Sequence, residues 1–152
     1  MEYSVRAASV ADAEDISRVI VRALRETNAK DYSPDVIARV EQSYSPAALA
    51  NLMSQRKVFV ATIEQQIVGT ASLDGKVVRT LFVTPEMQGR GVGKLLMAVV
   101  ERTAREDGVE VLAVQSSVTA EQFYLKVGFK AVRDSYHGEE RTIVMERTLV
   151  GS

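Results

Sequence analysis

The fold is decided by TLFVTPEMQGRGVGKLLMAVVERTAREDG, residues 80–108. An apolar run ending at Val83 predicts a strand, three glycines follow at positions 89, 91 and 93, and apolar residues from Leu95 onward recur with helical spacing. A strand, a glycine loop and a helix in this order typically bind phosphate, because the N–H groups of the helix's first turn are free to face an anion. Several families build such loops, so the spacing has to decide between them.

Two common phosphate-binding patterns do not fit this loop. A Walker A loop has Gly, four residues and then Gly-Lys-Ser/Thr, but here Gln88 replaces the first glycine and Leu95 replaces the hydroxyl residue. A dinucleotide-binding loop has Gly-x-Gly-x-x-Gly, but Lys94 occupies the position of the third glycine. The sequence therefore argues against both classes of nucleotide-binding protein.

Composition narrows the function further. The 152 residues are 46% apolar and 26% charged, which is typical of one globular domain and predicts a single domain over residues 1–152. A net charge of −1 gives no electrostatic reason to bind nucleic acid or an anionic membrane. The absence of cysteine excludes disulfides and a cysteine nucleophile, and with one histidine no metal site is expected. With no signal peptide or membrane-spanning run, we expect a cytoplasmic protein.

The segments around the loop predict helices on the N-terminal side. Ser9 begins a capping-box spacing, and Ser33 and Ser45 each precede a proline, which is typical of a helix start. Farther along the chain, Thr119 is the predicted N-cap of a helix that ends at Gly128.

Strands are predicted from runs rich in β-branched residues. Three such runs, 57–64, 67–74 and 76–83, are closely spaced, and Asp74-Gly75 is a strong hairpin signal, so we expect three antiparallel strands. The run 109–116 follows the glycine-loop helix and is expected to lie parallel to the third of these strands. Two more strands close the chain, which predicts a mixed α/β (α+β) sheet with helices on its faces.

Two motifs together carry a family resemblance. Gln88–Gly93 matches the pattern Gln/Arg-x-x-Gly-x-Gly/Ala, and Ala120–Phe129 matches Ala-x-x-Phe-Tyr-x-x-x-Gly-Phe about 30 residues later. Both, and the order of elements, resemble the GCN5-related N-acetyltransferase (GNAT) superfamily. The resemblance implies a mixed, mostly antiparallel sheet of six to seven strands, with helices on both faces and a splay between strands 4 and 5 that admits the pantetheine arm of acetyl-CoA.

The resemblance also implies the residues that hold acetyl-CoA. The glycine loop would bind the pyrophosphate, and the backbone of the third central strand would pair with the pantetheine and supply oxyanion donors. Glycines at 89, 91 and 93 would let the backbone approach the ligand and adopt φ values that a Cβ opposes. The predicted cofactor-binding residues are Leu81, Phe82, Val83, Gln88, Gly89, Arg90, Gly91, Val92, Gly93, Lys94 and Ser117. Ser117 stands where many relatives have asparagine.

Tyr124 matches the tyrosine that serves as general acid in the family. The reference pKa values of a thiol and a phenol are only about 1.5 units apart, so a phenol next to the sulfur can protonate the leaving thiolate. Packing on a helix face is the alternative role. The general base is open: Glu86, Glu110 and Asp74 are poorly placed, His137 has a suitable reference pKa, and a chain of water molecules is the other possibility.

The acceptor site is expected between the first helices, in residues 26–35. The predicted substrate-binding residues are Asp31, Tyr32 and His137, and Tyr44 is a further candidate to line the pocket. Asp31 could attract a cationic amine, with capping or packing as the alternative. The resemblance thus implies an N-acetyltransferase that moves an acetyl group from acetyl-CoA to an amine of a small molecule or protein, by direct attack in a ternary complex. A non-catalytic acetyl-CoA sensor is the alternative. The terminal strand, residues 140–149, is expected to leave an edge that a homodimer covers.

Overall fold

The computed structural model describes residues 3–149 and contains one seven-stranded sheet in the order β1-β2-β3-β4-β5-β7-β6. The elements in chain order are β1 (Tyr3–Ala7), η1 (Val10–Asp12), α1 (Ala13–Glu26), η2 (Asn28–Lys30), α2 (Pro34–Gln42), α3 (Pro46–Leu52), β2 (Lys57–Ile63), β3 (Gln66–Asp74), β4 (Val77–Val83), η3 (Pro85–Met87), α4 (Val92–Glu106), β5 (Val111–Ser117), α5 (Glu121–Lys126), β6 (Lys130–His137) and β7 (Glu140–Thr148).

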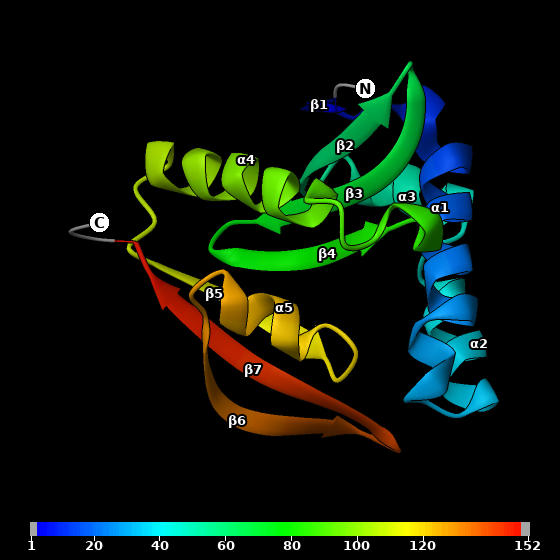
Figure 1. Cartoon of the computed structure of the whole chain (residues 1–152), viewed down its shortest axis with the longest axis vertical. Helices are drawn as coiled ribbons and strands as arrows, with labels where there is room; N and C mark the ends of the chain where they lie inside the picture. The colour runs from blue at the N-terminus through cyan, green and yellow to red at the C-terminus, as the bar shows by residue number, and fades with distance from the viewer. Residues whose placement is uncertain (1–2, 150–152) are drawn as a thin grey trace.

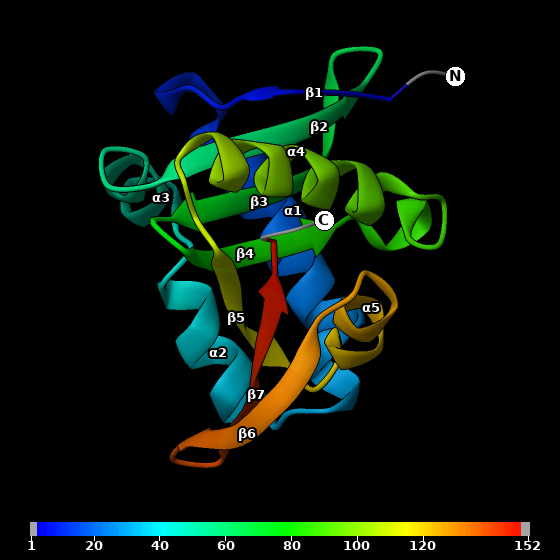
Figure 2. The same ribbon diagram turned by 90° about the vertical axis from the view of Figure 1, so that its left-hand side faces the viewer.

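Helices cover the two faces of this sheet, as predicted. Figures 1 and 2 show α4 and α5 on one face, while α1, α2 and α3 lie on the other. Each face has its own apolar core. Leu96 and Met97 of α4 are buried in the first core, together with Tyr124 of α5. Ile16 and Ile20 of α1 are buried in the second. Because helices cover both faces of the central sheet, a ligand-binding site is expected near the ends of the strands.

The predicted strand pairing is confirmed. β2, β3 and β4 are antiparallel neighbours, and β4 and β5 are parallel, as the crossover through α4 requires. The hairpin between β3 and β4 has Gly75 at a φ of 60°, a conformation that favours glycine. The predicted helix starts also hold, because the Val36 N–H donates to Ser33 Oγ at 3.3 Å and the Ala48 N–H donates to Ser45 Oγ at 3.2 Å.

The terminal strand does not form an edge of the sheet, which corrects one prediction. β7 lies between β5 and β6 and is antiparallel to both. Ile143 and Met145 of β7 are almost fully buried, so this strand has an interior place. The edge at this end of the sheet is β6, whose Val132 and Tyr136 are 52% and 66% exposed, and β1 forms the other edge. Within residues 3–149, no helix is long and apolar enough to cross a membrane.

Candidate active site

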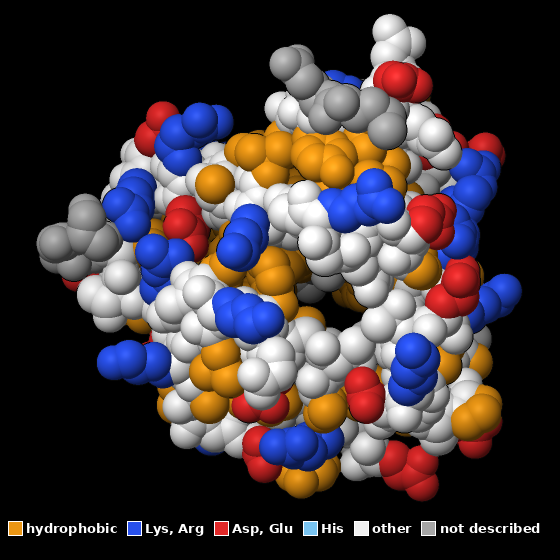
Figure 3. All heavy atoms as spheres, in the orientation of Figure 1, with side chains coloured by type: hydrophobic (Ala, Val, Ile, Leu, Met, Phe, Trp, Pro, Cys, Tyr) orange, Lys and Arg blue, Asp and Glu red, His pale blue; other side chains and the backbone are white. Residues whose placement is uncertain are grey.

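The two central strands separate soon after they pair. β4 and β5 pair at only two positions, the second of which is Val78 with Val114. The next residue, Arg79, has no opposite residue on β3, so β4 carries a bulge there. A bulge bends and twists its strand, and beyond it β4 and β5 diverge. This divergence confirms the predicted splay, and Figure 3 shows the molecule hollowed between β4 above and α5 below.

Beyond the bulge, one edge of β4 faces the opening. The Thr84 N–H donates to the Val68 carbonyl of β3 at 2.9 Å. Because backbone groups alternate in direction along a strand, those of Leu81 and Val83 face the opposite edge, toward β5. Gln88 Nε2 donates to the Val83 carbonyl at 3.1 Å, in agreement with this direction. The N–H groups of Leu81 and Val83 have no strand partner within residues 3–149 and can bond an extended ligand.

Glycines shape the loop between β4 and α4. Gly89 and Gly91 have φ values of 76° and 87°, which side chains with a Cβ rarely adopt. No heavy atom lies within 4 Å of a Cβ built on either residue, so both face open space. Gly91 is the N-cap of α4, and its carbonyl accepts from the Leu95 N–H at 3.0 Å. The first-turn N–H groups of α4 lack helical partners and are placed to bind an anion.

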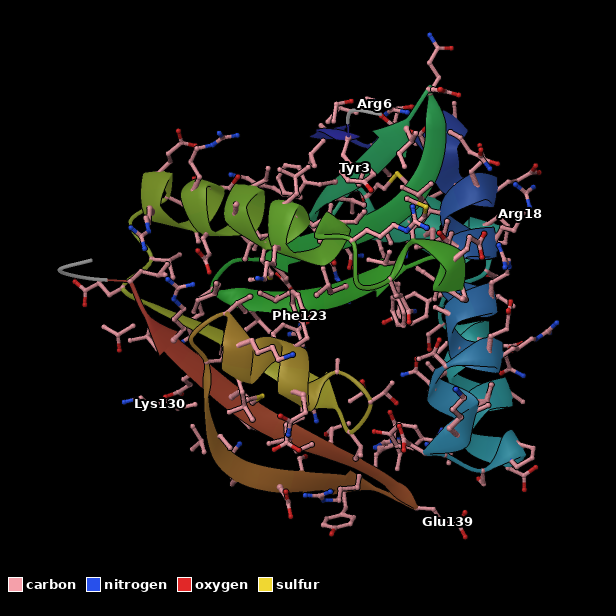
Figure 4. All side chains as sticks on the ribbon, in the orientation of Figure 1. Tyr3, Arg6, Arg18, Phe123, Lys130 and Glu139 are labelled. Atoms are coloured by element: carbon pink, nitrogen blue, oxygen red, sulfur yellow. The ribbon has the colours of Figure 1, made fainter. Side chains whose placement is uncertain are left out.

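Gly93 differs from the other two glycines in its backbone conformation, which corrects the expectation that it adopts a φ that a Cβ opposes. Its φ is not positive. A Cβ on Gly93 would lie 3.0 Å from Cε1 of Phe123 in α5. Figure 4 shows Phe123 between the two helices. The glycine therefore allows the start of α4 to pack closely against the helix that carries Tyr124.

The loop carries two positively charged side chains without ion-pair partners among residues 3–149, and two contacts hold it to α1 and the residue after it. Arg90 and Lys94 are exposed and form no ion pair within the described part of the chain. Gln88 Nε2 also reaches Thr27 Oγ1 at 3.3 Å, which ties the loop to the end of α1.

The second anchor is Glu86, one of the weak base candidates. Both of its carboxylate oxygens accept from Arg22 of α1, at 2.7 and 2.8 Å. The hydrogen bonds from Arg22 lower the pKa of Glu86 to about 2. Glu86 is therefore a poor proton acceptor, and its role is to fix the entry to the loop.

Tyr124 lies on the same face as the loop. Its ring makes edge-to-face contacts with Phe123 and Phe129, with centroids 5.4 and 5.3 Å apart. The side chain is 3% exposed, and its hydroxyl forms no hydrogen bond with another described residue. Burial raises the pKa of the phenol well above its usual value, with a smaller contribution from Tyr44, so the phenol keeps its proton at neutral pH. Tyr44 packs on the opposite face, so the two tyrosines approach each other through the splay.

Ser117 ends β5 beside α5. Its Oγ accepts from the Ala120 N–H at 3.1 Å, so the hydroxyl hydrogen is left to donate. The helix begins at Glu121 with Ala120 as N-cap, which makes the predicted Thr119 cap wrong. The Thr119 hydroxyl donates instead to Asp31 Oδ2 at 2.8 Å. A tertiary contact thus replaces the local cap.

A cavity of about 620 Å³ opens on the face opposite to Tyr124. Its walls come from the turn between α2 and α3, from α3 and the segment after it on one side, and from the β6–β7 hairpin on the other, with β4 and β5 between them. The lining residues are Ser43, Tyr44, Ala48, Asn51, Leu52, Arg56, Val78, Arg79, Gln115, His137, Glu140 and Thr142. The splay separates this cavity from the glycine loop, so two ligands can approach one point from opposite faces.

Three predicted acceptor residues take different positions. His137 lines the cavity, whereas Asp31 and Tyr32 do not. The Tyr32 hydroxyl donates to the Arg141 carbonyl at 2.6 Å and accepts from the Val118 N–H at 2.7 Å. This hydroxyl therefore connects the segment before α2 with β7 and with the end of β5.

Two cavity residues, Arg56 and Arg79, were not predicted from the sequence. Arg56 follows α3, and Arg79 sits at the bulge of β4. Arg56 and Arg79 reach the cavity because of the tertiary path of their two segments. Within residues 3–149, no three His, Asp or Glu side chains gather in a way that could hold a metal.

Comparison with known proteins agrees with this geometry. A family model described as an acetyltransferase (GNAT) domain matches residues 28–146. The uncharacterised N-acetyltransferase YafP of Escherichia coli K12 is 31% identical over 125 residues, covering 80% of this chain and 77% of the relative.

Solved structures show the same architecture. A GCN5-related N-acetyltransferase of Rhodopseudomonas palustris superposes with a TM-score of 0.91 at 27% identity, covering 98% of this chain and 97% of the other. The PaiA N-acetyltransferase of Thermoplasma acidophilum, solved in complex with coenzyme A, superposes with a TM-score of 0.85 over 97% of this chain and 99% of its own. Its identity is 22%, so this second likeness is one of fold.

Proposed function

This chain belongs to the GNAT acetyltransferase family, and we propose that it acetylates an amine by direct attack on acetyl-CoA in a ternary complex. Transfer of an acetyl group from acetyl-CoA follows from the family and its relatives. The order of the reaction and the residues that carry it are the proposal. One observation supports it most: the splay lies between an anion-binding loop with Tyr124 on one face and a cavity on the other.

Acetyl-CoA binds on the α4 face in this proposal. Its pyrophosphate lies at residues 88–94, against the first turn of α4, where Arg90 and Lys94 add positive charge. The pantetheine arm enters the splay and pairs with the free backbone of Leu81–Val83. Ser117 donates its hydroxyl hydrogen to the arm from the opposite strand. A coenzyme A complex of a neighbour with this fold supports the choice of ligand.

The acceptor amine enters from the cavity. Its nitrogen lone pair attacks the thioester carbon, and the carbonyl oxygen becomes an oxyanion that the free N–H groups of β4 stabilise. The C–S bond then breaks, the sulfur takes a proton from Tyr124, and the nitrogen loses a proton to water. Solvent returns a proton to the phenolate. His137 lines the cavity and is the alternative acceptor for the proton from nitrogen, whereas the carboxylate of Glu140 is paired with Arg39.

The cofactor site is tested with two glycine variants on one helix. Gly91→Glu places an anion where the pyrophosphate is expected and should abolish acetyl-CoA binding in calorimetry. Gly108→Glu is the control, because Gly108 has a similar φ of 81°, faces open space and lies just past the other end of α4. Thermal melts measure the strain in each variant. Equal acetyl-CoA affinity for the folded Gly91→Glu variant and the wild type would remove the loop from the site.

We also propose that residues 1–152 form one catalytic domain that works as a cytoplasmic homodimer. The exposed edge of β6, with Val132 and Tyr136, is the surface that a second copy would cover. Light scattering at tens of micromolar protein should give the mass of a dimer. A monomer mass at that concentration rejects this assembly and leaves the acetyl-transfer proposal intact.

A further inference from the structure

The acceptor cavity has an excess of positive charge. Its lining includes the guanidinium groups of Arg56 and Arg79 and one carboxylate, that of Glu140. Glu140 accepts from Arg39 at 2.9 Å, so its charge is already balanced. Arg79 donates through Nε to Asp74 at 3.3 Å, an exposed pair of small energetic weight. The two terminal nitrogens of Arg79 have no partner within residues 3–149, so most of its hydrogen-bonding capacity remains free.

Arg56 stands out among these groups. It is half-buried, and its side chain forms no hydrogen bond or ion pair with any residue from 3 to 149. A guanidinium that is partly removed from water without a counter-charge is destabilising. A ligand that brings a carboxylate would restore the lost interactions, because the planar fork of arginine matches a carboxylate in geometry and charge.

These charges lie at the reacting end of the cavity. Burial raises the pKa of Tyr44, the positive charges of Arg56 and Arg79 lower it, and the negative charge of Glu140 raises it, so all three charged groups lie near its phenol. Tyr44 in turn contacts Phe82 of β4 edge to face, with ring centroids 5.9 Å apart. Phe82 belongs to the strand segment that is expected to hold the thioester. A group bound by the two arginines is therefore close to the place where the amine reacts.

We propose that this cavity selects acceptors that carry a carboxylate close to the amine, with Arg56 and Arg79 binding the carboxylate. The inference rests on the proposed acetyl transfer and specifies its acceptor. A free amino acid and a peptide with an acidic residue near its N-terminus share this chemistry. Polyamines and lysine-rich peptides bring further positive charge and are disfavoured. Arg56 determines specificity by binding and takes no part in bond formation.

The test compares acceptors that differ only in the carboxylate. One arm uses free amino acids against the same amino acids as amides, and the other uses short peptides with Glu against the same peptides with Gln at the second position. Release of free thiol from acetyl-CoA gives kcat/KM for each. A charge-assisted bond to arginine is worth roughly ten- to a hundredfold in binding, so the carboxylate member should be preferred by about that factor. The arm with the larger preference identifies the source of the carboxylate.

Variants assign the preference to Arg56. Arg56→Gln should reduce the ratio of kcat/KM between carboxylate and amide members by tenfold or more, and Arg56→Lys should retain part of it because the charge remains. Arg102→Gln removes the same charge from an exposed position on α4, on the other face, and should leave the ratio unchanged. High salt should reduce the wild-type preference.

The outcomes separate the two proposals. Equal use of both members of each pair, a preference for the amide or for spermidine, or an unchanged ratio in Arg56→Gln overturns the carboxylate inference and leaves acetyl transfer standing. Failure of every amine in a protein that binds acetyl-CoA also overturns it. Failure to bind acetyl-CoA counts instead against the proposed cofactor site.

Discussion

Replacing Tyr124 by phenylalanine separates its chemical role from its structural one. The hydroxyl has no hydrogen-bond partner among the described residues, so its removal leaves no orphaned group. The ring keeps its edge-to-face contacts with Phe123 and Phe129. We therefore expect the free energy of unfolding to change by less than about 1 kcal/mol. The acetyl-CoA affinity should also remain, because the loop and the β4 edge are untouched.

The expected loss is in the chemical step. General-acid assistance contributes roughly 10²–10⁴ in rate, which corresponds to about 3–5 kcal/mol of barrier. Because burial raises the pKa of Tyr124, the phenol is protonated on the low side of that pKa, which includes the whole neutral range. Tyr124 should thus produce no alkaline limb in the wild-type profile below about pH 10. A fall in kcat with little change in KM for acetyl-CoA indicates an interaction made only in the transition state.

The assay measures thiol release with the amine that wild type acetylates fastest, in single turnovers so that product release does not mask chemistry. Tyr136→Phe is the matched control, since Tyr136 is 66% exposed on β6. A Tyr124→Phe enzyme within about threefold of the wild-type rate refutes the acid role. A large loss of stability with normal turnover in the folded fraction would show instead that the hydroxyl is structural.

Two further predictions concern stability. Asp12→Asn should cost about 1–2 kcal/mol at pH 7, because hydrogen bonds from Arg6 hold the pKa of Asp12 at about 2. This contribution is complete above about pH 4 and is lost as the pH falls toward 2, so melts of variant and wild type should converge in acid. Tyr32→Phe leaves two backbone groups without their partner and should cost about 1–3 kcal/mol in urea melts, whereas Tyr136→Phe should cost almost nothing.

Local signals predicted much of the fold. The serines at 33 and 45 cap their helices because capping needs only a side chain and the next three residues. The Asp74-Gly75 turn holds for the same reason. Thr119 is not the cap because the helix begins one residue later, with Ala120 as N-cap, and the Thr119 hydroxyl donates instead to the distant Asp31. Sequence spacing contains no information about such a partner.

The candidate site likewise contains some residues that local sequence motifs predict and others that they do not. The glycine loop and Tyr124 lie in contiguous motifs, so their positions were predictable from spacing. Gly93 was expected to adopt a φ that a Cβ opposes, yet its φ is not positive and its close neighbour is the ring of Phe123 on another helix. Arg56 and Arg79 were not predicted, because a bulge and the end of α3 bring them to the cavity. Bulges and helix ends are set by packing across the sheet, which one-dimensional periodicity does not report.

The interior position of β7 has a consequence for the order in which the enzyme becomes competent. Residues 80–106 form the loop and helix of the cofactor site by contacts with strands that precede them in the chain. The core around Tyr124 and Phe129 also needs Ile143 and Met145, which come later and lie between β5 and β6. During synthesis from the N-terminus, the binding half can therefore form before the half that positions the acid. In a nascent chain that has not reached residue 140, we therefore expect the proposed cofactor loop to form before Tyr124 is held in its core.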